Sequence, residues 1–171
     1  MATTFKSSKT VGRKVKPVPK GYHTLTPGLT VKDAAKAIDF YKKAFNAVER
    51  SRMGDPDGRV MHAELEIGDS LFMIGEEMLD RGVRGPKSIG GTAVSLNLYL
   101  DDADATFKQA VGAGAKGLQP VGLMFWGDLY GKVEDPYGHI WGLCTRVEDL
   151  SPEEIDRRGR EWMSKQTGGQ G

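Results

Sequence analysis

An order of elements occurs twice along this chain: an extended segment, an amphipathic helix, and then further extended segments. Residues 30–34 can be laid over residues 99–103, which brings the end of a strand and the start of a helix into register in both halves, with Ile38 over Phe107. Sequence identity between the halves is sparse, but the order of elements agrees. We therefore predict two tandem βαβββ modules, which places the chain in the α+β class.

The first half combines two periodicities. Residues 30–46 carry apolar side chains at helical spacing with charged residues between them, which predicts an amphipathic helix. Residues 25–31 and 60–67 alternate as half-buried strands do, and a further strand follows at 71–74. Residues 55–58 indicate a turn, because Pro suits its second position and Gly its fourth.

The second half repeats this order. Residues 94–100 alternate, and Asp101-Asp102 is expected to cap a helix that ends near Val111. Three more strands are predicted, at about residues 117–120, 124–133 and 139–146. Ser151-Pro152-Glu153-Glu154 is a capping box with Pro at the first helical position, which predicts a helix running to about Met163.

These patterns predict one domain over residues 21–149, built from modules at 21–80 and 90–149. A flexible basic tail is expected over residues 1–20, because that segment has little apolar surface to bury. A C-terminal helix with a frayed end is expected over residues 150–171.

Charge and cysteine content argue against several kinds of partner. The chain has 24 Lys and Arg against 23 Asp and Glu, a net charge of +1, so neither nucleic acid nor a membrane surface is expected as a partner. The single Cys144 cannot form a disulfide within the chain, and the first twenty residues contain no apolar stretch of signal-peptide length. We therefore expect a cytoplasmic protein.

Three segments resemble the PhnB-like branch of the glyoxalase/bleomycin-resistance (vicinal-oxygen-chelate) superfamily: residues 30–45 (TVKDAAKAIDFYKKAF), 62–73 (HAELEIGDSLFM) and 124–139 (MFWGDLYGKVEDPYGH). The resemblance covers about residues 21–149. It implies that each half bends its four strands into a scoop, that the scoops form a U-shaped mixed sheet around a cavity, and that the protein forms a homodimer. A shared fold does not by itself supply a function.

The resemblance also allows a test for a metal site. Members such as glyoxalase I and the extradiol dioxygenases take His or Glu ligands from the first and last strand of each module. The matching positions fall on Thr26, Ser95, Phe72 or Met73, and Gly142. None of these is a metal-ligand type, and moving the alignment by one residue does not supply one. We therefore expect neither a metal nor another cofactor.

His62 and Glu64 are weak catalytic candidates outside those positions. They share one face of the predicted strand with Glu66, where an imidazole beside a carboxylate could bind a metal or act as an acid/base pair. The alternative is a solvated or hydrogen-bonded strand face. The other histidines are expected to be structural or surface residues and the cysteine an apolar filler: His23, His139 and Cys144.

A cluster of aromatic residues indicates a small-molecule site, because aromatic side chains give large, rigid contact areas and stack on planar ligands. Trp126, Asp128 and Tyr130 are predicted to alternate on one strand face with Lys132, and Asn97 is predicted on the cavity face of its strand with Ser95 and Tyr99. The candidate ligand-binding residues are Trp126, Tyr130, Phe125, Asn97, Trp141 and Asp128. The alternative is that these rings pack the core or a dimer contact.

Three functions follow from these features. The first is a metal-independent binding protein that sequesters a planar or antibiotic-like ligand, with Asp128 as the counter-charge for a cation. The second is a glyoxalase-like lyase or isomerase, or a dioxygenase-type enzyme, with a non-standard site that uses His62 and Glu64, or Asp128 and Tyr130. The third is an interaction role in which the aromatic residues form a dimer contact and the C-terminal helix docks on a partner. Whether the protein is an enzyme stays open.

Overall fold

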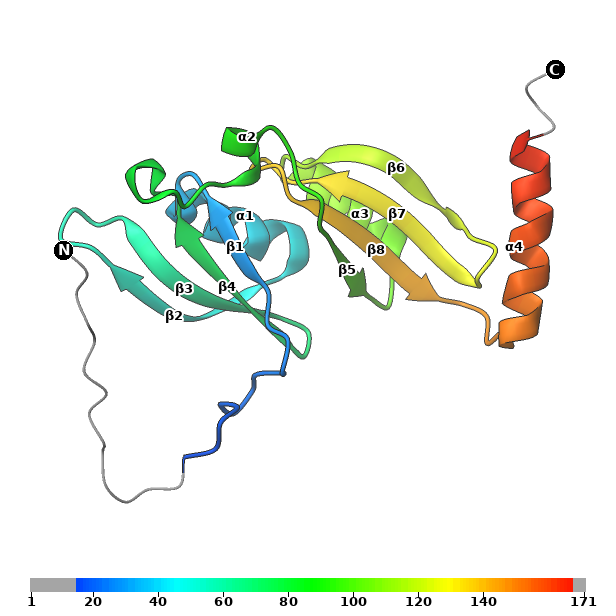
Figure 1. Ribbon diagram of the computed structural model, residues 1–171, viewed down its shortest axis with the longest axis horizontal. Helices are drawn as coiled ribbons and strands as arrows, with labels where there is room; N and C mark the ends of the chain where they lie inside the picture. Colours follow the sequence, from blue (N-terminus) through cyan, green and yellow to red (C-terminus); the bar gives the residue numbers. More distant parts are fainter. Residues whose placement is uncertain (1–14, 168–171) are drawn as a thin grey trace.

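The computed structural model describes residues 15–167 and contains two βαβββ modules in sequence (Figure 1). The first module consists of β1 (Gly28–Val31), α1 (Ala34–Phe45), β2 (Val48–Gly54), β3 (Val60–Ile67) and β4 (Ser70–Glu76). The second consists of β5 (Ser95–Tyr99), α3 (Ala103–Gly112), β6 (Lys116–Leu123), β7 (Asp128–Glu134) and β8 (Ile140–Arg146). This order confirms the predicted α+β class and the tandem repeat.

Two further pieces lie outside the modules. A linker joins them and contains a single 3-10 turn (Leu79–Arg81) and the short helix α2 (Pro86–Ile89). After β8 the chain continues into α4 (Pro152–Thr167), where the Ser151 hydroxyl accepts a hydrogen bond from the Glu154 backbone N–H, as the capping box predicts. No helix within residues 15–167 is long and apolar enough to cross a membrane.

Each module forms its own four-stranded mixed sheet. The strand orders are β1-β4-β3-β2 and β5-β8-β7-β6. In each sheet the first strand runs parallel to the last, and the other neighbours are antiparallel. Within the described residues no strand of one sheet pairs with a strand of the other, and the two sheets lie next to each other along the long axis of the molecule (Figure 1).

The core lies between each sheet and its helix. Helical spacing places six apolar residues of α1 on one face, and all of them are buried: Ala34, Ala37, Ile38, Tyr41, Ala44 and Phe45. On β3, Ala63 and Leu65 are buried in the same layer, whereas His62 and Glu64 are half-buried on the other side, because side chains alternate along a strand. Each sheet therefore has a face covered by α1 or α3 and an opposite face that we call its open face.

A buried polar and aromatic contact joins the two modules. The Tyr41 hydroxyl on α1 donates a 2.7 Å hydrogen bond to Asp135 Oδ2 in the turn between β7 and β8. Trp141 on β8 donates to the same oxygen at 2.9 Å, and its ring lies 4.9 Å from that of Phe45. The Asp135 side chain is fully buried, with His139 Nδ1 at 3.5 Å from Oδ2.

These contacts set the pKa of Asp135. Burial alone would raise the pKa, but the contacts with His139, Trp141 and Tyr41 outweigh it and hold the pKa below its usual value. The carboxylate is therefore ionised at neutral pH, and it accepts donors from both modules.

Strand bounds in the second module differ from the sequence expectation. The strand predicted over residues 124–133 begins only at Asp128, because Gly127 adopts a φ of 92° that an L side chain rarely adopts and closes a turn. The strand predicted at 117–120 extends over Lys116–Leu123, where Pro120 is tolerated because β6 is an edge strand. The C-terminal helix also runs beyond Met163, to Thr167.

Candidate functional site

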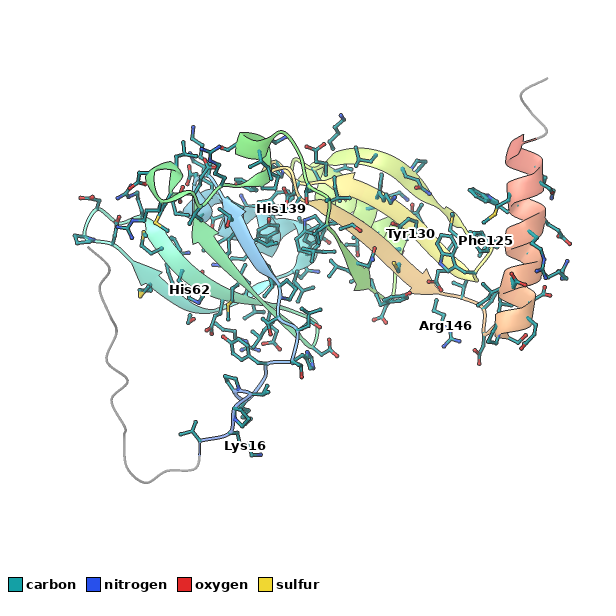
Figure 2. The ribbon with its side chains drawn as sticks, viewed as in Figure 1. Lys16, His62, Phe125, Tyr130, His139 and Arg146 are labelled. Atoms are coloured by element: carbon teal, nitrogen blue, oxygen red, sulfur yellow. The ribbon has the colours of Figure 1, made fainter. Side chains whose placement is uncertain are left out.

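The open face of the second sheet carries a cavity of about 600 Å³ beside the start of β7. Figure 2 shows Phe125 next to α4 and Tyr130 further into the second sheet. We call this cavity and its lining the aromatic site. Its lining residues come from four strands, the turn before β7 and α4: Asn97, Tyr99, Gln119, Met124, Phe125, Trp126, Asp128, Tyr130, Lys132, Cys144 and Trp162.

The turn over residues 124–127 positions two of the rings. The Gly127 N–H donates to the Met124 carbonyl at 3.0 Å, and the Met124 N–H donates to the Asp128 carbonyl at 2.8 Å. The Gly127 carbonyl in turn accepts the N–H groups of Val147 and Glu148, both at 3.0 Å. Backbone hydrogen bonds on both sides of the turn therefore fix where Phe125 and Trp126 emerge.

The aromatic rings form the walls of a slot. The Phe125 and Trp126 ring centroids are 4.9 Å apart with planes at 90°, and those of Trp126 and Tyr130 are 5.7 Å apart with planes at 67°. These edge-to-face contacts are favourable for aromatic pairs. All three side chains are half-buried, so ring surface remains accessible in the cavity.

Asp128 places a negative charge beside these rings. The residue is only 5% exposed, and its Oδ2 accepts hydrogen bonds from Trp126 Nε1 at 3.1 Å and from the Tyr99 hydroxyl at 3.2 Å. The charge of Asp128 raises the pKa of Tyr99, and burial followed by that same charge raises the pKa of the Cys144 thiol. Cys144 is therefore a protonated thiol at neutral pH, which is a poor nucleophile.

Lys132 supplies the opposite charge further along β7. Its Nζ lies 5.7 Å from the centroid of the Tyr130 ring, a cation–π distance. It lies four positions after Asp128 on the strand, which corresponds to about 13 Å between their Cα atoms. The aromatic site thus has a negative end at Asp128 and a positive end at Lys132.

The structure gathers five of the six candidate ligand-binding residues around this one cavity: Trp126, Tyr130, Phe125, Asn97 and Asp128. Trp141 does not line this cavity: its side chain is 2% exposed, lies on the helix-covered face of β8, and lines a cavity of about 450 Å³ that Asn97 also lines. Sequence reasoning missed Trp162, which lies on α4 outside the tandem repeat. The sequence gives no signal for this, because the helical spacing of residues 152–163 does not show which sheet the helix packs against.

His62 and Glu64 lie on the first sheet, away from the aromatic site (Figure 2). Glu64 accepts a short hydrogen bond from the Tyr22 hydroxyl, and His62 Nε2 lies 3.8 Å from Glu64 Oε1. The hydrogen bond from Tyr22 is the main cause that holds the pKa of Glu64 below its usual value, against burial. A carboxylate whose pKa is lowered and which already accepts a hydrogen bond is a weak general base.

The positions that correspond to metal ligands do not fit a metal. Thr26 precedes β1, and its hydroxyl donates to the His23 carbonyl at 3.0 Å. At Gly142 an added Cβ would lie 2.1 Å from Asn97 Oδ1 and 2.9 Å from the Tyr130 ring, so a ligand side chain there would have to displace both. Over residues 15–167 no three His, Cys, Asp or Glu side chains gather as a metal site would require.

Comparison with known proteins defines the class to which this protein belongs. The profile of the Glyoxalase/Bleomycin resistance protein/Dioxygenase superfamily matches residues 22–143. The chain belongs to this superfamily, and the resemblance noted in its sequence is confirmed.

Individual proteins of similar sequence or structure are also known. An uncharacterized protein of Mycobacterium tuberculosis is 43% identical over 134 residues, which cover 77% of this chain and 79% of the relative. A solved Arabidopsis thaliana structure is similar with a TM-score of 0.60 and 30% identity, over 71% of this chain and 98% of that one. A PhnB protein from Bacillus cereus, described as a putative 3-demethylubiquinone-9 3-methyltransferase, shares the fold with a TM-score of 0.54, 21% identity, and coverage of 72% and 99%.

Proposed function

We propose that this protein binds a planar small molecule that carries a positive charge, and that it does so at the aromatic site without a metal. The observation that carries this proposal is the buried Asp128 between Trp126 and Tyr130 at an accessible cavity. A flat ligand can stack on these rings, and its cationic group can approach the carboxylate.

Energetics favour a cation at this place. Asp128 is taken out of water by the fold, and its hydrogen bonds come from Trp126 and Tyr99, which are neutral donors. Arg146, the cross-strand neighbour of Asp128 on β8, forms its ion pair with Asp149. A buried carboxylate whose hydrogen bonds come from neutral donors interacts more strongly with an arriving cation than an exposed one does, because the local dielectric is lower. Lys132 is held over the Tyr130 ring at the other end of the site.

A pair of probes of opposite charge tests the proposal. Proflavine, a planar cation, and anthraquinone-2-sulfonate, a planar anion of similar size, are titrated into the wild type by isothermal calorimetry. We expect proflavine to bind at least about tenfold more tightly, which corresponds to about 1.4 kcal/mol. Equal affinity for the two probes, or no binding of proflavine, would contradict the proposal.

Variants localise the site. Trp126→Ala and Asp128→Asn are each expected to weaken proflavine binding about tenfold, since one removes a stacking wall and the other the counter-charge. Met53→Ala is the control, because Met53 is 60% exposed on β2 of the other module. Circular dichroism melts establish that each variant remains folded. Unchanged affinity in Trp126→Ala would place the binding elsewhere.

We also propose that the protein pairs with a second copy of itself. Leu25 and Tyr99 are 85% and 70% exposed at the rim of an apolar cavity of about 450 Å³ beside the edge strand β5. Exposed apolar side chains around a hollow favour association, and homodimers are what the family resemblance implies. Analytical ultracentrifugation should give a dimer for the wild type and a monomer for Leu25→Glu, whereas a monomeric wild type would refute the pairing.

A further inference from the structure

α4 is an addition to the matched part of the chain, and it stands at the end of the second sheet. The superfamily profile ends at residue 143, whereas α4 spans Pro152–Thr167. Figure 1 shows the helix across the ends of β7 and β8, next to the turn that precedes β7. This turn carries two of the rings of the aromatic site.

Specific contacts hold α4 in this place. The Trp162 ring lies against that of Phe125, with centroids 5.8 Å apart and planes at 36°. Gly159 allows the close approach, because a Cβ there would already lie 3.2 Å from the Phe125 ring. Arg158 forms a short ion pair with Glu148, which lies between β8 and α4, whereas its 2.8 Å ion pair with Glu154 is within α4 itself. The helix is thus docked by ring packing and by charge.

α4 borders the hollows on both sides of Asp128. Trp162 lines the aromatic site and is 44% exposed, so part of its indole surface is accessible there. Ile155, two turns earlier on the helix, lines a neighbouring cavity of about 420 Å³. The two cavities share Tyr99, Trp126 and Asp128. One helix therefore bounds the space on either side of the buried carboxylate.

We propose that α4 is the outer wall of the ligand site and that Trp162 is a specificity-determining residue that limits the width of the planar ligands accepted. This inference rests on the proposed function and adds to it an element beyond the superfamily match. The Trp162 indole lines the cavity and packs against Phe125, so ring contacts run from Trp162 through Phe125 and Trp126 to Tyr130, with Trp162 at one end of the row. A three-ring ligand then contacts aromatic side chains at both ends, and a bulky substituent meets the indole.

Two cations that each have three fused rings but differ in bulk test this inference. Proflavine is a flat diaminoacridine, whereas ethidium is a diaminophenanthridinium that also carries a phenyl and an ethyl group. In Trp162→Ala we expect proflavine to bind about tenfold more weakly, because one stacking surface is lost. Ethidium should bind equally well or more tightly, because its phenyl group can occupy the vacated space. The ratio of the two dissociation constants is therefore expected to reverse or to shift by about tenfold.

Two further variants distinguish the loss of the Trp162–ligand contact from a general destabilisation of α4. Trp162→Phe retains a ring and should keep the proflavine dissociation constant within about threefold of wild type. Arg160→Ala is the control on the same helix, because Arg160 is exposed and its ion pair is with Asp156 on the same surface. It should leave both constants unchanged. Calorimetry gives the constants independently of tryptophan fluorescence.

The possible results distinguish this inference from the proposed function. If Trp162→Ala leaves proflavine affinity within twofold while Trp126→Ala weakens it, α4 is not part of the wall and only the inference fails. If Trp162→Ala weakens both probes equally, Trp162 does not determine ligand width and the inference fails in that respect. If the wild type binds neither probe, the proposed function fails and the inference fails with it.

Discussion

Removal of the Tyr41 hydroxyl probes the polar contact between the modules. In Tyr41→Phe the buried Asp135 carboxylate loses a 2.7 Å hydrogen bond from a residue that is 0% exposed, and the ring packing stays in place. Hydrogen bonds to charged groups contribute about 1.5–3 kcal/mol, and water cannot easily replace a donor in a fully buried position. We expect the free energy of unfolding to fall by about 2 kcal/mol.

Urea denaturation followed by circular dichroism measures this loss, and a domain of this size should melt about 4–8 °C lower. Tyr137→Phe is the matched control, because the Tyr137 ring lies 6.4 Å from that of Tyr41 and its hydroxyl has no hydrogen-bond partner in the described structure. It should change the stability by less than about 0.5 kcal/mol. A loss in Tyr41→Phe no larger than in this control would show that Trp141 and the backbone N–H groups satisfy Asp135 without Tyr41.

Three other measurements follow from the structure. The folded-state pKa of Asp135 is lowered, so its contribution to stability is fully present above the unfolded pKa of about 4 and is lost as pH falls through the folded pKa. Between about pH 5 and pH 3 the wild type should lose stability more steeply than Asp135→Asn, and parallel curves would contradict a lowered pKa of Asp135. Gly85→Ala should cost about 1–3 kcal/mol in urea denaturation, because the new Cβ would lie 2.7 Å from the Thr30 carbonyl oxygen while the φ of −84° suits any residue; an unchanged midpoint would show that the linker shifts freely. EDTA should leave the melting temperature unchanged, and a marked drop would reveal a structural metal.

The fold was predictable because its signals are local. The α1 face is set by helical spacing, and the open and covered faces of β3 are set by alternation, so neither depends on distant residues. The turns at 55–58 and 135–138 likewise follow from Pro and Gly at fixed positions. Local patterns did not predict how the two modules pack together, because the contacts between them join residues far apart in the sequence. The hydrogen bond from Tyr41 to Asp135, for example, joins residues 94 positions apart.

The candidate site was predictable in part. Trp126, Asp128 and Tyr130 do meet, although Trp126 reaches the cavity from a turn and not from a strand. Alternation accounts for the place of Trp141: Gly142 pairs with Asn97 and faces the open side, so its strand neighbour Trp141 faces the covered side. A role of Trp141 in ligand binding stays a prediction. Trp162 could not be placed from sequence, because nothing in the periodicity of a helix says which sheet it docks on.

The Gly127 carbonyl accepts hydrogen bonds from Val147 and Glu148. These two bonds determine how short a fragment can be used to study ligand binding. A shorter version cut at the superfamily boundary, residue 143, would keep nearly all of both sheets but would lack both of these donors. The turn that carries Phe125 and Trp126 would then keep its internal hydrogen bonds but lose those to the segment after β8. A ligand screen on such a fragment would test a less ordered site, so a negative result should be interpreted only for a protein that extends through α4.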